Sequence, residues 1–330
     1  MELKYQMNKS SNKKIIEIVN YCRQNSRCIV DIRYNEPMAE FTTFKVGGSA
    51  DCWISPYGDD FPQFSASLLY MARTAGIPVF ILGGGANIVI SDNGIRGIIL
   101  DTGQWRGKTL TEEGIVFRSG TSIDEAVDCA VGDCLSGMEF LAGMPGTIGG
   151  SVYMNARCYG KEIIDTLVWT EILDFTACAQ GGMPEIKRIA ANKEDFGYKR
   201  SPFQGKDCLI LSACLKLQPG KKDNILDEMK KNRRDRKEKG HYLFPCAGSA
   251  FKNNRDFGKP TGQIIDELGM KGFSVGGAQI APFHGNIVIN TGSATSAEIR
   301  ALMNKVSEKV KNATGFVLEP EILFVGECPA

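Results

Sequence analysis

The sequence predicts an α+β fold built from short strands and helices and divided into more than one domain. The chain has 330 residues, and a single hydrophobic core seldom extends that far, so two or three domains are expected. Short apolar runs such as Val79–Leu82 and Ile98–Leu100 are typical of strands. Before them, the apolar spacing of residues 64–75 predicts a helix, which Gly76 and Pro78 end.

The composition excludes several classes of function. The formal net charge is +1, so the charge balance does not point to nucleic acid or a membrane surface as a partner. No apolar run approaches the ~20 residues of a membrane span, and the amino terminus lacks the apolar region of a signal peptide. The eleven cysteines contain no Cys-x-x-Cys pair and are expected to be reduced thiols of a cytoplasmic protein. With only His241 and His284 in the chain, neither a histidine-based metal site nor a Ser-His-Asp triad is expected.

Periodic apolar residues predict the other elements. Helical stripes occur in the amino-terminal segment, after Ser122, within the charge-rich residues 219–238 and after the capping box Thr295–Glu298. Extended runs predict strands at Ile88–Ile90, Ile115–Ser119, Leu167–Leu173, Cys208–Leu217 and Phe316–Leu318. The last predicted helix has one apolar face, which indicates core rather than function: Ile299, Leu302, Met303, Val306 and Val310.

The stretch from Met138 to Gly160 is the most distinctive part of the sequence. An apolar run enters a turn at Pro145-Gly146 and then meets a second glycine pair, Gly149-Gly150. Proline fixes φ and glycine permits positive φ, so the main chain bends sharply and allows a ligand to approach closely. Exposed N–H groups in such a bend bind anions, and phosphate is the anion expected. The competing interpretation is an ordinary glycine-rich loop in a β-rich domain.

An earlier glycine turn changes the balance between these interpretations. The predicted strand Val79–Leu82 runs into Gly83-Gly84-Gly85-Ala86-Asn87, and the β-branched residues Ile88–Ile90 follow. A dinucleotide fingerprint would open a helix at its last glycine, whereas Ile-Val-Ile favours a strand. We refer to residues 83–87 as the first glycine turn and to residues 145–150 as the second. Two such turns could close on one pyrophosphate from two sides.

Two further motifs complete a pattern that resembles a known family. Gly248-Ser249-Ala250-Phe251-Lys252-Asn253 and Leu318-Glu319-Pro320-Glu321 follow the two glycine turns in order. The four motifs, between about residue 41 and residue 326, resemble the UDP-N-acetylenolpyruvoylglucosamine reductase family of peptidoglycan synthesis in its shorter, type II form. The resemblance implies a two-subdomain FAD-binding domain of the PCMH/VAO type and a C-terminal α+β substrate-binding domain. The expected boundaries are 1–105 for the amino-terminal segment with the first FAD-binding subdomain, 106–218 for the second subdomain and 219–330 for the substrate-binding domain.

The resemblance also implies the site residues. Non-covalently bound FAD is expected to contact Leu82, Gly83, Gly84, Gly85, Ala86, Asn87, Pro145, Gly146, Thr147, Gly149, Gly150 and Ser151. Substrate binding is implied for Tyr198, Lys252, Asn253 and Asn286. Ser249 is implied as the acid that protonates the substrate carbon, although a serine in a turn more often bonds to its own main chain. Glu321, rather than Glu319, is implied to face the enol.

Two departures from the family pattern concern the cation that stabilises the enolate. The family has Tyr-Arg-x-Ser where this chain has Tyr198-Lys199-Arg200-Ser201, so Lys199 occupies the arginine position. If this segment is extended, Lys199 and Arg200 point to opposite faces, and only one of them can face the flavin. The family's Asn-Ala-Gly-Ala-Tyr-Gly is here Asn-Ala-Arg-Cys-Tyr-Gly, and Arg157 either supplies the missing guanidinium or points to solvent. The sequence leaves all three cations open.

The implied reaction has two halves. NADPH delivers hydride to the flavin, and the reduced flavin then passes hydride from N5 to the vinyl group of UDP-N-acetylglucosamine enolpyruvate, giving UDP-N-acetylmuramate. Two alternatives remain. One is another FAD-linked oxidase or dehydrogenase of the same fold. The other is a paralogue that binds a UDP-sugar or flavin without turnover, which Lys199 and Arg157 motivate.

Overall fold

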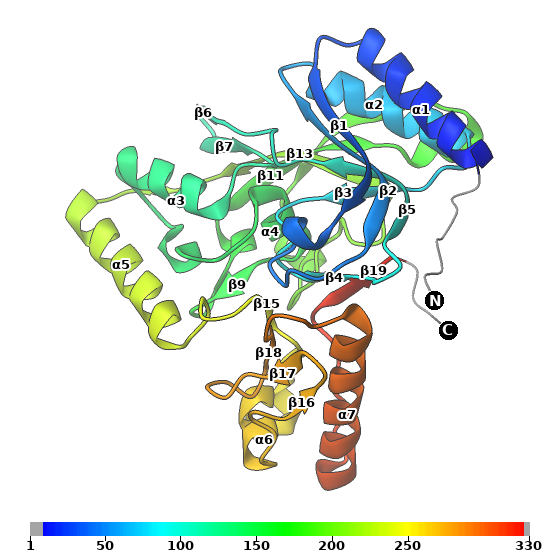
Figure 1. The fold of residues 1–330 in the computed structure, drawn as a ribbon. Helices are drawn as coiled ribbons and strands as arrows, with labels where there is room; N and C mark the ends of the chain where they lie inside the picture. The colour runs from blue at the N-terminus through cyan, green and yellow to red at the C-terminus, as the bar shows by residue number, and fades with distance from the viewer. Residues whose placement is uncertain (1–8, 327–330) are drawn as a thin grey trace. The chain divides into compact units, whose positions relative to one another are not determined.

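The computed structural model describes residues 9–326, and the chain divides into two compact units. Within the described residues, unit 1 contains residues 9–36, 50–84 and 96–232, and unit 2 contains residues 37–49, 85–95 and 233–326. Figure 1 gives the labels of the helices and strands. Unit 2 therefore takes two segments from the amino-terminal third of the chain, in addition to the carboxyl-terminal third.

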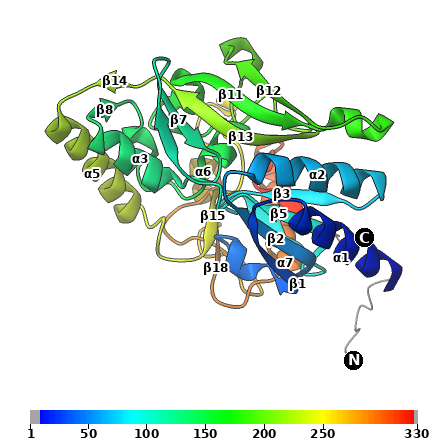
Figure 2. The ribbon, with the colours of Figure 1, turned by 90° about the horizontal axis from the view of Figure 1, so that it is seen from above.

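The first sheet of unit 1 has the strand order β1 (Ile29–Pro37), β2 (Ser49–Tyr57), β5 (Ile95–Asp101) and β3 (Val79–Leu82). Helices α1 (Lys9–Gln24) and α2 (Phe61–Thr74) lie side by side and share one hydrophobic core with this sheet (Figures 1 and 2). The helix predicted at residues 64–75 is confirmed as α2. It begins earlier than expected because Pro62 is tolerated in the first turn, where N–H groups lack helical partners. β3 pairs in parallel with β5, and the first glycine turn follows directly from its end.

The second sheet of unit 1 is antiparallel, with the order β12 (Glu185–Ala190), β11 (Leu167–Asp174), β13 (Cys208–Leu215), β7 (Ile115–Arg118) and β6 (Lys108–Leu110) (Figure 2). The predicted strands in β7, β11 and β13 are thus confirmed. Helices α3 (Ile123–Gly132) and α4 (Ile148–Tyr153) pack on it, together with Ile225 and Met229 of the charge-rich helix α5 (Lys222–Glu238). Two short antiparallel pairs complete the unit: β8 (Leu135–Ser136) with β14 (Gln218–Pro219), and the hairpin of β9 (Arg157–Cys158) and β10 (Lys161–Glu162).

Unit 2 is built on an antiparallel sheet with the order β15 (Cys246–Ser249), β18 (Ile287–Asn290), β17 (Ala278–Ile280) and β16 (Ser274–Val275). Helices α6 (Thr261–Glu267) and α7 (Ser296–Thr314) pack against it. A separate parallel pair joins β4 (Ile88–Ile90) to β19 (Leu323–Val325).

The predicted end signals and core face of α7 are confirmed. Thr295 and Glu298 form the capping box, and Gly315 ends the helix in the left-handed conformation at φ 78°. The five apolar residues predicted for the inner face are all buried. The strand predicted at 316–318 is wrong: these residues have no regular structure, and Phe316 instead stacks on Phe257 at 4.3 Å between ring centres.

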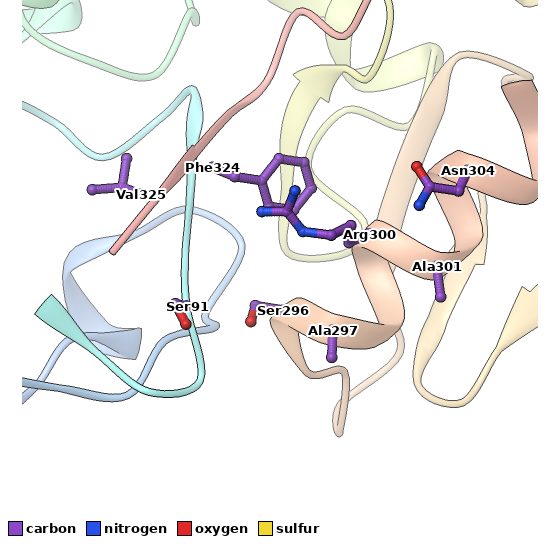
Figure 3. Close-up of a pocket in the computed structure, with 8 residues that line it drawn as sticks. All are labelled: Ser91, Ser296, Ala297, Arg300, Ala301, Asn304, Phe324 and Val325. Carbon is purple, nitrogen blue, oxygen red and sulfur yellow. The ribbon is translucent and has the colours of Figure 1, made fainter. Parts of the chain in front are cut away.

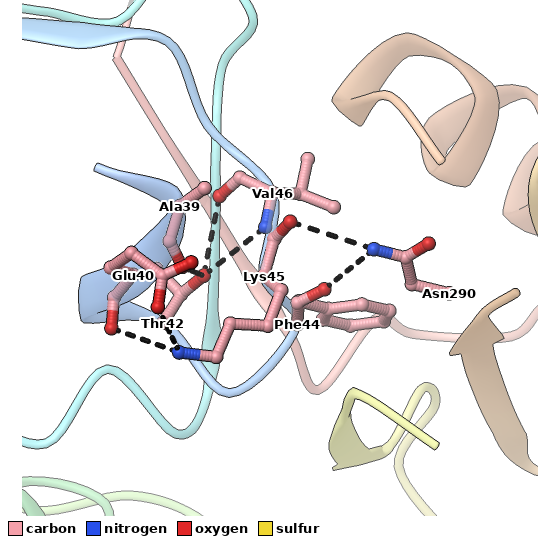
Figure 4. A network of polar contacts seen from close by, with 7 residues as sticks. All are labelled: Ala39, Glu40, Thr42, Phe44, Lys45, Val46 and Asn290. Carbon is pink, nitrogen blue, oxygen red and sulfur yellow. Dashed lines mark hydrogen bonds and ion pairs between the residues drawn. The ribbon is translucent and has the colours of Figure 1, made fainter. Parts of the chain in front are cut away.

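Asn290 holds residues 37–49 within unit 2 (Figure 4). Its amide nitrogen donates to the main-chain oxygens of Phe44 at 3.0 Å and Lys45 at 3.5 Å. Its side-chain oxygen accepts from the N–H groups of Gly292 at 2.8 Å and Ala294 at 3.0 Å. Asn290 is 4% exposed and its bond to the oxygen of Phe44 is buried, so this bond satisfies a main-chain carbonyl that water does not reach.

Among residues 9–326, no helix combines the length and apolar character needed to cross a membrane. The same residues contain no group of three or more His, Cys, Asp or Glu side chains arranged to hold a metal ion.

We predict that Asn290→Ala lowers the free energy of unfolding by about 2 kcal/mol or more, because it leaves buried main-chain groups without partners. The shift of the urea midpoint measures this loss. Asn304→Ala, on the exposed side of α7, serves as the control and should stay within about 0.5 kcal/mol of the parent protein. Equal midpoints for the two variants would contradict the assignment of Asn290.

Candidate functional site

The two glycine turns meet within unit 1. A Cβ atom added to Gly84 would lie 2.7 Å from Cα of Gly146, and one added to Gly83 would lie 3.0 Å from Oγ1 of Thr147. A side chain at Gly84 cannot fit at this distance, so the main chains of Gly84 and Gly146 are in contact. Gly84 and Pro145 are exposed and Gly146 is half-exposed, so this contact lies at the surface of unit 1 and is open to a ligand.

The main chain at this contact divides into groups used internally and groups left available. The N–H of Gly149 donates to the oxygen of Ser119 at 2.8 Å, and the N–H of Gly150 to Oγ1 of Thr147 at 3.3 Å. Among the hydrogen bonds of the described residues, none is donated by the N–H groups of Gly84, Gly146 or Thr147. Main-chain N–H groups around a glycine turn bind anions, so this contact fits the diphosphate of a dinucleotide cofactor. Gly149 and Ser151 are buried and support the turn from behind.

The remainder of the first glycine turn belongs to unit 2, where its contacts are structural. Gly85 has φ 61°, and a Cβ there would lie 2.0 Å from the oxygen of Phe41, so glycine is required. The side-chain nitrogen of Asn87 donates to the main-chain oxygen of Glu321 at 3.0 Å, and the main-chain oxygen of Asn87 accepts from the N–H of Leu323 at 3.0 Å. Contacts of Leu82, Ala86 and Asn87 with a cofactor stay a prediction.

The segments that contain Ser249 and Glu321 are bonded to each other in unit 2. The N–H of Glu321 donates to the oxygen of Ala250 at 2.9 Å, so Glu321 lies beside the residue that follows Ser249. The N–H of Lys252 donates to the oxygen of Glu319 at 2.8 Å, and Phe251 forms a β-bridge with Pro320. Two motifs about 70 residues apart in the chain thus form one short ladder. Glu321 is buried at 6% exposure, whereas Ser249 is partly exposed.

The predicted substrate-binding residues of unit 2 have partners within the protein. Asn286 accepts from the N–H of Phe251 at 2.9 Å and donates to its oxygen at 2.8 Å, which uses both ends of the buried amide to brace the ladder. Asn253 accepts from the N–H of Thr261 at 2.9 Å, and Lys252 pairs with the carboxylate of Glu319. Their direct contact with substrate stays a prediction, and the structure adds a supporting role that the sequence analysis missed.

The segment with Lys199 and Arg200 is a tight turn, not the extended chain considered above. Gly197 and Arg200 exchange two main-chain hydrogen bonds, each of 3.0 Å, and Lys199 has φ 56°. Tyr198 and Lys199 therefore occupy the two central positions of the turn. The alternation that would separate Lys199 from Arg200 does not apply here. Arg200 is exposed and Lys199 half-exposed, and both belong to unit 1 with Arg157.

Burial sets the ionisation of several groups in the two units. Asp101 is paired with Leu82 across β3 and β5, and burial raises the pKa of its carboxyl to about 6. Burial, assisted by the positive charge of Arg236, lowers the pKa of His241 to about 4. Burial also lowers the pKa of His284. Both imidazoles are thus neutral at neutral pH and add no positive charge to unit 2.

A cavity of about 180 Å³ lies in unit 2 beside the start of α7 (Figure 3). It is lined by Ser91, Ser296, Ala297, Arg300, Ala301, Asn304, Phe324 and Val325, and none of these is a predicted site residue. The start of α7 is not open to an anion, because the carboxylate of Asp92 already accepts from the N–H groups of Ser296 at 2.8 Å and Ala297 at 3.0 Å. The cavity therefore offers no anion site at the start of α7.

Two family models match the chain. The model described as "FAD binding domain" matches residues 65–177, which include both the end of β3 and the second glycine turn. The model described as "UDP-N-acetylenolpyruvoylglucosamine reductase, C-terminal domain" matches residues 239–325, which include Ser249 and Glu321. The two matches confirm the fold class predicted from the sequence, an FAD-binding domain followed by a second α+β domain.

Relatives of known name resemble the chain over most of its length. UDP-N-acetylenolpyruvoylglucosamine reductase of Treponema pallidum is 38% identical over 89% of this chain and 94% of its own length. The protein of the same name from Borreliella burgdorferi is 40% identical over 88% of this chain and 93% of its own. A crystal structure of UDP-N-acetylenolpyruvylglucosamine reductase from Thermus caldophilus is similar with a TM-score of 0.72 and 28% identity, covering 90% of this chain and 99% of that one.

We predict that Gly84→Ala weakens FAD binding by roughly tenfold or more, equivalent to about 1.4 kcal/mol. The added methyl group would push the first glycine turn away from Gly146 and displace the N–H groups around it. The flavin content of the purified protein and titration of the apoprotein with FAD measure the effect. Gly132→Ala, where an added Cβ meets nothing within 4 Å, is the matched control. Equal FAD affinity in both variants would show that the contact of the turns does not serve the cofactor.

Proposed function

Since the chain belongs to the UDP-N-acetylenolpyruvoylglucosamine reductase family, we propose that it reduces UDP-N-acetylglucosamine enolpyruvate to UDP-N-acetylmuramate, with NADPH as the reductant, in peptidoglycan synthesis. The observation that carries this proposal is the ladder in unit 2 that bonds the main chain of Glu321 to Ala250, the residue after Ser249. The family match over residues 239–325 includes both residues. The second match, over residues 65–177, supports FAD as the cofactor.

The cofactor would be held by the contact of the two glycine turns. The N–H groups of Gly84, Gly146 and Thr147 would bind its diphosphate, because no described residue accepts hydrogen bonds from them. Hydride transfer between NADPH and the substrate is the chemistry that bound FAD supplies. The protein contributes orientation, charge stabilisation and a proton.

Ser249 would hold the proton that the substrate carbon receives. A serine hydroxyl is a weak acid, so it needs neighbouring groups that favour proton release in the transition state. The motif around it supplies a rigid frame, since Gly248 has φ 76° and the main chain of Ala250 bonds to both Asn286 and Glu321. Glu321, which is buried beside this frame, would orient the enol and the hydroxyl.

The cation that stabilises the enolate would be Lys199. Its place between Tyr198 and Ser201 matches that of the family arginine, and the tight turn presents it at a central position. Lysine offers a point charge rather than a planar fork, which is enough for an enolate oxygen. Gln204 supports this position by donating to the main-chain oxygen of Lys199 at 3.1 Å.

The decisive experiment follows the absorbance of NADPH with the flavin-loaded protein, with and without the enolpyruvyl UDP-sugar. Oxidation that requires this substrate supports the reductase. Flavin reduction that requires a different substrate would favour another FAD-linked oxidase or dehydrogenase. A protein that binds flavin and UDP-sugar without consuming NADPH would be a paralogue without turnover. Either of the last two outcomes overturns the proposal.

We predict that Ser249→Ala lowers kcat by about 10²-fold or more, the usual contribution of a general acid. The reduction of bound flavin by NADPH alone should stay unchanged, because that half-reaction needs no proton from Ser249. Stopped-flow measurement of the two half-reactions separates these effects. Ser293→Ala, at an exposed loop position of unit 2, is the control. Loss of both half-reactions would point to misfolding or to a different role.

We predict that Lys199→Ala lowers kcat by about 10²-fold, whereas Arg200→Ala changes it by less than about threefold. Only a charge at the family position would stabilise the enolate, and Lys199→Arg should therefore keep most of the activity. Steady-state kinetics of the three variants test this. A larger loss for Arg200→Ala than for Lys199→Ala would reverse the assignment.

A further inference from the structure

Arg157 belongs to a polar chain inside unit 1 that reaches the turn of Tyr198 and Lys199. In the hairpin of β9 and β10, Arg157 is the cross-strand partner of Glu162, and its Nη1 lies 3.3 Å from Oε1 of that carboxylate. The guanidinium also lies over the ring of Tyr198, with 5.5 Å between its central carbon and the ring centre. One side chain thus contacts both a hairpin carboxylate and the turn.

Asn155 extends the chain from the same carboxylate to the main chain of the turn. Its amide nitrogen donates to Oε2 of Glu162 at 2.9 Å and to the oxygen of Gly197 at 2.9 Å. Asn155 is fully buried and has φ 44°, a conformation that non-glycine residues seldom adopt. The carboxylate of Glu162 therefore receives Arg157 on one oxygen and Asn155 on the other.

These contacts fix the turn at the main chain of Gly197, its first residue, and at the ring of Tyr198. Gly197, which Asn155 holds, closes the turn through its two bonds with Arg200. Beyond the turn, Ser201 donates to the oxygen of Tyr153 at 2.7 Å. Because Tyr153 ends α4, which begins at the second glycine turn, the turn is tied to the same helix that supports the cofactor contact.

We propose that Arg157 is a positioning residue, which sets the place of Tyr198 and Lys199 through Glu162 and the Tyr198 ring and is not the cation that meets the enolate. This inference rests on the proposed function. A guanidinium paired with a carboxylate is largely neutralised, so it stabilises a developing negative charge less than it would without that carboxylate. The planar group can bond a carboxylate at its edge and cover a ring with its face, which lysine cannot do.

The experiment compares Arg157→Gln, Arg157→Lys, Glu162→Gln and the double variant with Gln at both positions, all in the flavin-loaded protein. For Arg157→Gln and Arg157→Lys we expect the KM of the UDP-sugar to rise about five- to tenfold, with kcat within about threefold of the parent. Glu162→Gln should raise KM to a similar extent. In the double variant the two effects should not multiply, since both substitutions break the same connection.

Hydrogen exchange gives a readout that does not depend on turnover. The amides of Gly197 and Arg200, which close the turn, should exchange faster in Arg157→Gln and in Glu162→Gln. Arg188→Gln is the matched control. Arg188 also pairs with a carboxylate, Glu113 at 3.4 Å, and covers an aromatic ring, Trp169 at 3.9 Å, but it lies on β12. Arg188→Gln should leave both KM and the exchange of these two amides unchanged.

The outcomes separate this inference from the proposed function. A parent protein that never oxidises NADPH with the enolpyruvyl substrate refutes the function, while hydrogen exchange still tests the connection to the turn. A fall in kcat of about 10²-fold in Arg157→Gln, recovered in Arg157→Lys and unaffected by Glu162→Gln, would make Arg157 the enolate cation and overturn the inference. Unchanged exchange at Gly197 and Arg200 would overturn it as well.

Discussion

The close approach of Gly84 to Gly146 is the constraint on which the candidate cofactor site depends. With 2.7 Å between a hypothetical Cβ and the opposite Cα, the end of β3 and the turn before α4 touch main chain to main chain. β3 belongs to the first sheet of unit 1, and α4 packs against the second. The contact therefore joins the two layers at the point where their N–H groups are available. Any side chain at this place would separate the sheets and cover those groups.

The parts of the structure that sequence predicted are those with local signals. The capping box and the periodic apolar face of α7 are each encoded by a few neighbouring residues, and both are confirmed. The two glycine turns also have local signals, and they meet in unit 1, although Gly149 and Gly150 lie in the first turn of α4. The turn at residues 197–200 has no such signal. Lysine seldom adopts φ 56°, and bonds from Asn155 and Gln204, both outside the turn, hold its main chain. Sequence periodicity cannot anticipate a conformation imposed by tertiary contacts.

Which segments of the chain belong to unit 2 could not be predicted from local sequence either, because long-range contacts decide it. Asn290 bonds to Phe44 across 246 positions of the chain, and β19 pairs with β4 across a similar separation. No sequence motif at either partner indicates which residue it contacts. The family resemblance gave the order of the motifs but not the membership of residues 37–49 and 85–95 in the unit of the carboxyl-terminal residues. Contacts of this range are also the slowest to form in folding.

The first glycine turn links two functions through a very short piece of chain. Gly84 contacts the second glycine turn in unit 1, whereas Asn87 bonds to the main chain of Glu321 in unit 2. Only Gly85 and Ala86 separate them. Gly85 is also fixed, since its φ of 61° and its proximity to Phe41 admit no side chain. The three consecutive glycines thus serve two purposes. Gly83 and Gly84 allow the close approach of the second glycine turn, and Gly85 makes the left-handed bend that precedes Asn87, whose side chain bonds to Glu321.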